Sequence, residues 1–460
     1  MPDVAAFYGR FAHTPCRGAL EVLDNTLVLI DQKGAITDVL SVSDVDFQKA
    51  FDQAKASGAL CQSGENSLFL PGMVDLHVHA PQWPQLGRAL HLPLDEWLNA
   101  YTFPLEARFR DADLARSVYP DLIATLLANG TTTAVYFSTI HMEASQILAE
   151  ACLNAGQRAF IGKVVMDDPS QCPDYYRDNS ASQAIDETQS FIEFVRGLSG
   201  NQVGIVQPMV TPRFIPSCSH TALVELGRVA DKMRCRVQTH CSEGDWEHQF
   251  VLERYGQSDT AALLELGLLQ RGSVLAHCNF VSQADMEIMK GSLTGIAHCP
   301  ISNAYFANSV FPLRRALDID VSVGMGTDIS GGPSPSIFEN ARFAIAASRM
   351  LEEGVDPDLV SASRGHPHSR IDFREALWVA TAGGAEVLDI PVGKFEKGQH
   401  FDAILVDHHR ATDRASFSNS STTGEDIIQE LIYNVSQSDV RRVWVGGRAV
   451  GGSSTVGSGL

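Results

Sequence analysis

Short apolar segments alternate with longer amphipathic patterns along most of this 460-residue chain. The apolar segments have the length of buried strands, and in the stretches between them apolar residues recur every three or four positions, as in helices. Eight strand–helix units predict an α/β fold, a (β/α)8 TIM-type barrel rather than an open sheet. The predicted strands are 73–77, 131–137, 159–165, 204–210, 236–240, 273–277, 293–298 and 320–326, and the predicted helices include 112–128, 143–155, 184–197, 221–232 and 259–268.

The chain on either side of this barrel has a different pattern. Apolar clusters separated by turn residues occupy 19–40, and β character returns at 392–407 and 440–450 after a helical region at 374–385. The Ser/Thr-rich interval 416–424 predicts an exposed loop. We predict that the two ends pair as one small β-sandwich domain: residues 1–70 form its N-terminal part, 71–385 the barrel, and 386–460 its C-terminal part.

A pair of histidines ends the first predicted strand, in the sequence His77-Val78-His79. Side chains alternate between the two faces of a strand, so these two imidazoles project to the same side. That arrangement lets one strand end supply two ligands to a single metal ion. Taken alone, an H-x-H pair on a solvated strand face is the plainer interpretation, so the metal hypothesis depends on further ligands.

Other predicted strands also end in residues that bind metals or move protons. His240 ends the fifth strand and is followed by Glu243, while His277 ends the sixth and Asp328 follows the eighth. A barrel brings the carboxyl ends of its strands to one mouth, where barrel enzymes place their catalytic groups. Three imidazoles and a carboxylate around an open coordination position suit a Zn²⁺ ion that generates hydroxide near neutral pH.

Several residues beside these candidates are predicted to be structural. Cys241, Cys278 and Cys299 each neighbour a histidine, but strand alternation turns their side chains to the opposite face, where they are expected as small buried residues. His298 on the seventh strand is expected to be a core residue. The sequence His141-Met142-Glu143 matches half of the H-x-E…P-C-x-x-C deaminase signature, and no P-C-x-x-C follows it, so that class of zinc deaminase is rejected.

Five motifs in strand order carry a family resemblance: PGMVDLHVHAPQ, TPRFIPSCS, QTHCSE, AHCNF and GMGTDISGG. Together they resemble the amidohydrolase superfamily. The stretches HAPQWPQLG, LDEWLNAYTFPLEARF and TPRF resemble the guanine deaminases within it, and the similarity covers about residues 68–340. The resemblance implies hydrolytic deamination of guanine to xanthine and ammonia, a step of purine catabolism, by a homodimer.

The same resemblance implies one Zn²⁺ per subunit and a role for each candidate. The metal ligands would be His77, His79, His240 and Asp328. Asp328 would also accept a hydrogen bond from the nucleophilic water, and His277 would lie beside the metal and contact that water or the substrate. Glu243 would carry a proton from the water to a ring nitrogen. Iron remains open as the metal, because this ligand set also suits it.

A flat heteroaromatic substrate with a carbonyl and ring N–H groups needs a planar donor, an amide and a stacking surface. Arg213, Gln82 and Phe214 supply these, and Trp83 is a further candidate for the pocket lining. The complete predicted set of substrate contacts is Gln82, Trp83, Arg213, Phe214, His240, Glu243, His277 and Asp328.

Composition limits the partners. A formal net charge of −20 and a pI of about 5.1 argue against nucleic acid or an anionic membrane as the main partner. Apolar runs are too short to span a bilayer, and the first residues lack the plan of a signal peptide. Nine cysteines without C-x-x-C spacing are typical of a reduced cytoplasmic protein. Ser458-Gly459-Leu460 only faintly resembles a peroxisomal signal and is discounted.

Two alternatives stay open at this point. The same chemistry could act on another aminopurine, a pterin or an s-triazine, which assays on several substrates would separate. A non-catalytic binding protein with a barrel fold would be expected to lack metal ligands or the acid–base residue, and this chain has them all.

Overall fold

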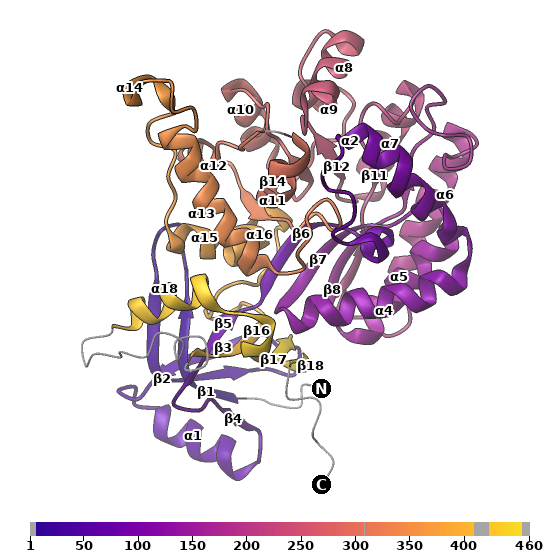
Figure 1. Ribbon diagram of the computed structural model, residues 1–460. Coiled ribbons are helices and arrows are strands. Elements are labelled where there is room, and N and C mark those ends of the chain that lie inside the picture. Colours follow the sequence, from indigo (N-terminus) through magenta and orange to yellow (C-terminus); the bar gives the residue numbers. More distant parts are fainter. Residues whose placement is uncertain (1–5, 308, 409–422, 453–460) are drawn as a thin grey trace.

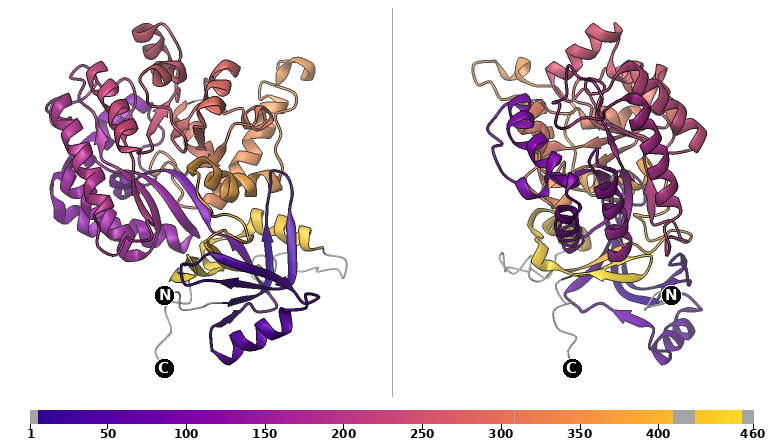
Figure 2. Two further views of the ribbon diagram at one scale, coloured as in Figure 1. Left: turned by 180° about the vertical axis from the view of Figure 1, so that it is seen from behind. Right: turned by 90° about the vertical axis from the view of Figure 1, so that its right-hand side faces the viewer.

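A parallel barrel stands on a smaller β domain in this computed structural model, which describes residues 6–307, 309–408 and 423–452 (Figures 1 and 2). The tripeptide 458–460 and most of the predicted loop at 416–424 lie outside the described residues. The barrel strands are β6 (Met73–His79), β7 (Thr131–Phe137), β8 (Arg158–Gly162), β10 (Val206–Pro208), β12 (Gln238–Cys241), β13 (Val274–His277), β14 (Gly295–His298) and β15 (Val323–Met325).

The barrel closes between its fourth and fifth strands. Its eight strands follow the order β10-β8-β7-β6-β15-β14-β13-β12, and every pairing is parallel. A parallel bridge joins Val210 to Val237, and the Gln238 amide donates to the Val210 carbonyl at 3.0 Å. The predicted (β/α)8 barrel is therefore confirmed, and the carboxyl ends of its strands meet at one mouth.

Helices surround the barrel on its outside. They are α4 (Ala112–Ala128), α5 (Met142–Ala155), α6 (Ala181–Arg196), α7 (His220–Met233), α8 (Asp245–Tyr255), α9 (Asp259–Glu265), α10 (Gln283–Ser292), α12 (Leu313–Ile319) and α13 (Ile337–Glu353). Shorter helices, α2 (Leu94–Trp97), α3 (Phe103–Ala107), α11 (Pro300–Ser302) and α14 (Ser361–Arg364), lie in the connections. Most outer helices begin with a Ser or Asp side chain that accepts a hydrogen bond from the first turn.

The third predicted strand is interrupted. It divides into β8 and the two-residue β9 (Val164–Val165), which pairs with β11 (Thr211–Pro212). Lys163 lies between β8 and β9, and its buried ammonium pairs with Asp178 at 2.9 Å and Glu187 at 3.1 Å. The pair β9–β11 therefore extends the barrel wall beyond the carboxyl ends of the third and fourth strands, toward the loop that carries Arg213.

A helical segment closes the end of the barrel opposite the mouth. α15 (Phe373–Trp378) continues through 379–383 into α16 (Gly384–Leu388), whose apolar side chains join those of the barrel interior in one cluster. The helix approaches closely because glycines face each other: a Cβ on Gly324 would lie 2.6 Å from the Cα of Gly384. This end of the barrel is therefore filled by side chains, and the candidate residues lie at the other end, the mouth.

The two ends of the chain form one β domain, as predicted. All its strands belong to one hydrogen-bonded sheet: β18 (Arg448–Gly451), β17 (Val440–Val445), β16 (Ala403–Asp407), β5 (Ser67–Pro71), β1 (Ala6–His13), β2 (Glu21–Ile30) and β3 (Ile36–Ser41), with β4 (Leu60–Gln62) paired to β1. Aromatic rings from both ends of the chain pack together; Phe7 stacks on Phe401 with ring centroids 3.8 Å apart. α1 (Phe47–Ala56) packs beside β1 and β2.

One C-terminal helix was not anticipated from the sequence. α18 (Gly424–Asn434) lies between the β domain and helices α13 and α15 of the barrel (Figure 1). Arg342 of α13 donates to the Ile432 carbonyl at 2.7 Å. Within the described ranges, no helix combines the length and the apolar character that crossing a membrane requires.

Candidate active site

All four predicted metal ligands converge at the barrel mouth. Nε2 of His77 lies 3.2 Å and Nε2 of His79 lies 3.5 Å from Oδ1 of Asp328. Nε2 of His240 lies 3.1 Å from Nε2 of His79. All four side chains are buried, so atoms from the first, fifth and eighth strands share one water-poor space.

These side chains have the chemical state that a metal ion requires. Burial lowers the pKa of His77, His79 and His240 well below the ordinary value and keeps the imidazoles neutral, which is the form that binds metals. Both ring nitrogens of His77 lack a hydrogen-bond partner within the described residues. His77, His79 and Asp328 each offer a ligand atom, and these atoms lie within 4.8 Å of one another. The residues therefore fit a zinc site.

Hydrogen bonds to a backbone carbonyl and to a buried carboxylate orient the residues at the strand ends around this cluster. Nδ1 of His240 lies 2.6 Å from the carbonyl oxygen of Arg213, which leaves Nε2 free to face the cluster. The buried Asp75 carboxylate accepts from the backbone N–H of His77 at 3.2 Å and of Thr327 at 2.9 Å. This bridge fixes the distance between the strand ends that carry His77 and Asp328.

Left-handed backbone occurs at the strand ends that carry these residues. Ser242, His277, Cys278 and Asp328 have φ values between 47° and 72°, although none is a glycine. Such residues cost of order 1–3 kcal/mol each and cluster at functional sites. These four positions lie at or directly after the ends of strands that present candidate residues, as expected for a site held in a demanding geometry.

Glu243 faces the cluster from the start of the β12–α8 connection. Its Oε2 lies 3.7 Å from Nε2 of His277, and its backbone N–H donates to Glu247 at 2.7 Å. Burial and, to a smaller extent, the negative charge of Asp328 raise the pKa of Glu243 to about 8. A carboxyl group with this pKa can accept and release a proton near neutral pH.

A second chain of hydrogen bonds fixes His277. Its Nδ1 lies 2.9 Å from the side-chain oxygen of Asn303, whose amide donates to Asn279 at 2.8 Å. Asn279 in turn donates to the Glu243 carbonyl at 2.9 Å. His277 and Glu243 are therefore held by the same network, and Nε2 of His277 points toward Glu243 and Asp328.

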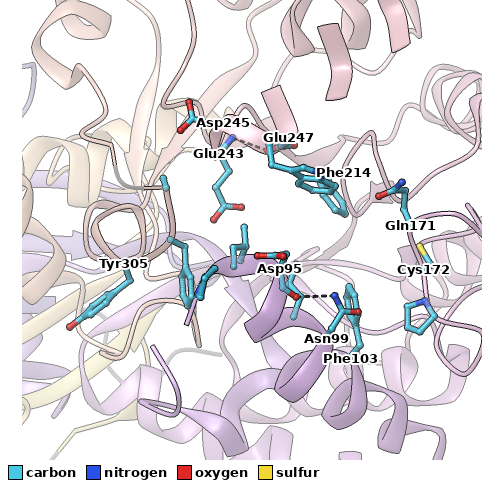
Figure 3. Close-up of a pocket in the computed structure, with 18 of the residues that line it drawn as sticks. Asp95, Asn99, Phe103, Gln171, Cys172, Phe214, Glu243, Asp245, Glu247 and Tyr305 are labelled. Carbon is cyan, nitrogen blue, oxygen red and sulfur yellow. Dashed lines mark hydrogen bonds between the residues drawn. The ribbon is translucent and has the colours of Figure 1, made fainter. Parts of the chain in front are cut away.

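A cavity next to the cluster contains most of the predicted substrate contacts. Its lining residues are His79, Gln82, Leu94, Trp97, Leu98, Arg213, Phe214, His240, Glu243, Phe306, Asp328 and Gly331. It opens into an outer cavity of about 680 Å³ that shares Phe214, Glu243 and Phe306 with it. Figure 3 shows the Glu243 carboxyl group and the Phe214 ring reaching into this outer cavity from separate loops.

Trp83 lies outside this set of lining residues. Its indole N–H donates to Asp121 on α4 at 2.7 Å, so the ring anchors the first loop to a barrel helix. His298 is buried beside Phe311, and Cys241, Cys278 and Cys299 are buried free thiols, as predicted.

The sequence did not indicate the residues that hold the candidate side chains in position. Glu106, Asn303 and Asp75 are buried, and each holds a candidate residue by hydrogen bonds. Asp75 lies two positions before His77, and this closeness was a usable signal. Glu106 and Asn303 are separated from their partners by 107 and 26 positions, so no local pattern indicated them.

Comparisons with known proteins agree with this geometry. The model of the amidohydrolase family matches residues 68–450. The chain therefore belongs to the amidohydrolase family, as the motifs predicted. Among its relatives, the probable guanine deaminase of Schizosaccharomyces pombe is 35% identical over 97% of this chain and 83% of that protein, and the guanine deaminase of Mus musculus is 33% identical over 98% and 97%.

A solved structure shares the whole architecture. The guanine deaminase of C. acetobutylicum, with bound guanine in its active site, is 28% identical and covers 97% of this chain and 99% of its own, with a TM-score of 0.85. The combination of barrel and split β domain is therefore a common property of this chain and that enzyme.

Proposed function

We propose that this protein is a zinc-dependent hydrolase that deaminates guanine to xanthine and ammonia. The observation that carries the proposal is the position of Glu243. This buried carboxyl group lines one cavity together with His79, Asp328 and the substrate-binding candidates Gln82 and Arg213. The near full-length similarity to guanine deaminases, one of which is solved with bound guanine, supports guanine as the substrate.

Four side chains are proposed as the ligands of one zinc ion per subunit: His77, His79, His240 and Asp328. Their neutral imidazoles and single carboxylate match the nitrogen and oxygen ligands that zinc prefers. A zinc ion held there would supply an activated water at neutral pH.

The residues around the cluster divide the proton transfers between them. Glu243 accepts a proton from the attacking water and delivers it to the ring nitrogen beside the amino-bearing carbon, while Asp328 accepts a hydrogen bond from that water. The water oxygen bonds to this carbon. Glu243 then carries the second water proton to the amino group, the C–N bond breaks, and ammonia leaves. The carbon keeps the new oxygen as a carbonyl, so guanine and water give xanthine and ammonia.

His277 is proposed to stabilise the same step without binding the metal. Its Nδ1 is engaged by Asn303, and its Nε2 has no hydrogen-bond partner within the described residues. That nitrogen faces Glu243 and Asp328 at 3.7 and 4.0 Å. It is therefore available to the attacking water or to an atom of the substrate.

Substrate recognition is assigned to the part of the cavity lining formed by Arg213, Gln82 and Phe214. Arg213 is proposed to donate to the carbonyl oxygen of guanine, Gln82 to pair with the ring edge, and Phe214 to stack on the ring. The Phe214 ring lies 6.2 Å from that of His240. This places an aromatic surface directly beside a proposed ligand.

We further propose a cytoplasmic homodimer that acts in purine catabolism. All nine cysteines are free thiols, which fits a reducing compartment. The dimer is suggested by the resemblance to guanine deaminases, and light scattering of the purified protein measures it directly.

The test combines metal analysis with ammonia release from a panel of guanine, adenine, cytosine, 8-oxoguanine, a pterin and an aminated triazine. We expect about one zinc ion per chain and turnover of guanine well above that of every other compound. Faster turnover of another aminopurine, a pterin or a triazine would support the alternative that keeps the chemistry and changes the substrate. Active protein free of metal would overturn the proposed mechanism.

A further inference from the structure

The buried carboxylate of Glu106 accepts hydrogen bonds from both Arg213 and Gln82, the two polar residues proposed to contact the substrate. Glu106 of α3 is fully buried, and it lies outside the metal cluster. Its Oε2 accepts from Nη1 of Arg213 at 2.6 Å, and its Oε1 accepts from Nη2 of Arg213 at 3.2 Å. The same Oε1 accepts from Nε2 of Gln82 at 2.8 Å. One side chain therefore holds both residues that face the ring edge of the substrate.

Because Glu106 binds only two of the N–H groups of Arg213, other N–H groups of this side chain remain as donors. The guanidinium has five N–H groups, and Glu106 takes one from each terminal nitrogen. Nη1 is also 3.8 Å from the sulfur of Met166, and the ring of Phe103 lies beneath the guanidinium at 5.1 Å. Nε and the second N–H of Nη2 have no protein partner in the described part of the chain, so they remain for a ligand.

The same contact decides which way the Gln82 amide faces. Glu106 is a carboxylate and can only accept, and the backbone N–H of Ser330, which can only donate, lies 3.1 Å from the Gln82 oxygen. Turning the amide by 180° would oppose donor to donor and acceptor to acceptor. The Ser330 hydroxyl also donates to that oxygen, at 3.5 Å. The oxygen is therefore directed at Ser330, and the remaining N–H of Gln82 is fixed in direction.

Charge balance gives Glu106 a second effect. Its negative charge compensates the buried guanidinium of Arg213, which would otherwise attract an anion into the cavity. The compensated pair still offers oriented N–H groups to a neutral carbonyl oxygen. The arrangement is therefore suited to an uncharged lactam, in which a carbonyl stands next to a ring N–H.

We propose that Glu106 is a positioning residue that makes this site select the lactam edge of its substrate. It acts through Arg213 and Gln82, and it contributes to discrimination more than to the chemical step. The inference rests on the proposed guanine deaminase function. It predicts that purines with the 6-carbonyl are preferred over the same ring without it because Glu106 fixes the donors that bind the oxygen.

The experiment compares guanine with 2-aminopurine, which has the same amino-bearing ring and lacks the lactam. Parent and Glu106→Gln proteins are assayed for kcat and KM on guanine and for the inhibition constant of 2-aminopurine as a competitor. We expect KM for guanine to rise about 10- to 100-fold, with kcat changed less than about tenfold, since the 6-carbonyl oxygen is not bonded to the attacked carbon and takes no part in the proton transfers there. The inhibition constant of 2-aminopurine should change less than about threefold, and bound metal should stay at the parent level.

Asp402→Asn is the matched control for loss of a buried carboxylate. Asp402 also receives two hydrogen bonds from one arginine, Arg158, at 2.9 and 3.1 Å, but it joins the barrel to the β domain away from the mouth. We expect this variant to lose thermal stability without any change in the preference for guanine over 2-aminopurine. Glu106→Asp keeps the charge and should retain part of the preference, and it serves as the test variant if Glu106→Gln does not fold.

The outcomes separate the two proposals. Equal weakening of guanine and 2-aminopurine in Glu106→Gln, or an unchanged KM, would overturn the role of Glu106. A parent protein that binds 2-aminopurine and holds metal but does not deaminate guanine would overturn the proposed function instead.

Discussion

Nδ1 of His240 and the carbonyl oxygen of Arg213 lie 2.6 Å apart. A carbonyl can only accept, so the proton resides on Nδ1 and the lone pair of Nε2 faces the cluster. The side chain of the same arginine lines the substrate cavity. The backbone after the fourth strand therefore couples the orientation of a proposed metal ligand to the position of a proposed substrate contact.

Replacing Glu243 by Gln should remove most of the turnover while the metal stays bound. The amide keeps the shape of the side chain and cannot shuttle a proton, so kcat is expected to fall about 10²- to 10⁴-fold. Ammonia release and metal content measure the two parts of this prediction. Glu253→Gln, on the exposed side of α8, is the control and should behave like the parent protein. Parent-like turnover by Glu243→Gln would show that another group carries the proton.

Removal of the metal should abolish activity and lower stability. Dialysis against a chelator is expected to stop turnover, and added Zn²⁺ should restore it; Fe²⁺ is tested in parallel because the ligand set also suits iron. At metal concentrations about 100 times the Kd, binding adds roughly 2.7 kcal/mol to the free energy of unfolding, which a denaturant titration can detect. Asp328→Ala should hold much less metal than the parent. Metal content equal to that of the parent would mean that Asp328 is no ligand.

Loss of the Asn303 side chain should impair catalysis without removing the metal. Asn303→Ala leaves Nδ1 of His277 without its acceptor at 2.9 Å, so the imidazole can rotate and change tautomer. We expect kcat to fall about 10- to 100-fold, by analogy with other residues that orient imidazoles. Asn340→Ala removes another buried asparagine, on α13, and should affect stability alone. If both variants were equally active, His277 would need no such orientation.

Acid should destabilise the fold partly through His141. Burial, and then the positive charge of Arg110, lower the pKa of His141 to about 4, and its Nε2 lacks a partner within the described residues. The unfolded chain binds this proton below about pH 6.5. Between these values the unfolded state holds more protons, so the free energy of unfolding decreases as the pH falls.

The variant His141→Gln should show a shallower loss of stability over this range. Because the side chain is partly exposed, we expect a difference of only about 1 kcal/mol between pH 6.5 and 4.5. Urea titrations of parent and variant at several pH values measure it, and contributions common to both proteins cancel. Parallel pH profiles would exclude His141 as a source of the acid sensitivity.

Strand-end motifs were predictable from the sequence because their information is local. His77 and His79 are two residues apart on one strand, and the periodicity of the surrounding segments indicated a closed parallel barrel that brings distant strand ends together. The interruption of the third strand at Lys163 was not predictable, since it depends on burial of the ammonium beside Asp178 and Glu187. Helix α18 was missed because the Ser/Thr-rich stretch before it dominates the local composition.

The sequence by itself determined the fold class, the family and the residues that can bind a metal or carry a proton, because strand and helix periodicity and short motifs act over a few positions. Only the tertiary structure decided that Glu106 holds Arg213 and Gln82, that Asn303 orients His277, and that Trp83 turns away from the cavity. These contacts join residues from different strand–helix units. Their geometry depends on how the loops pack over the closed barrel, and no short stretch of sequence encodes that packing.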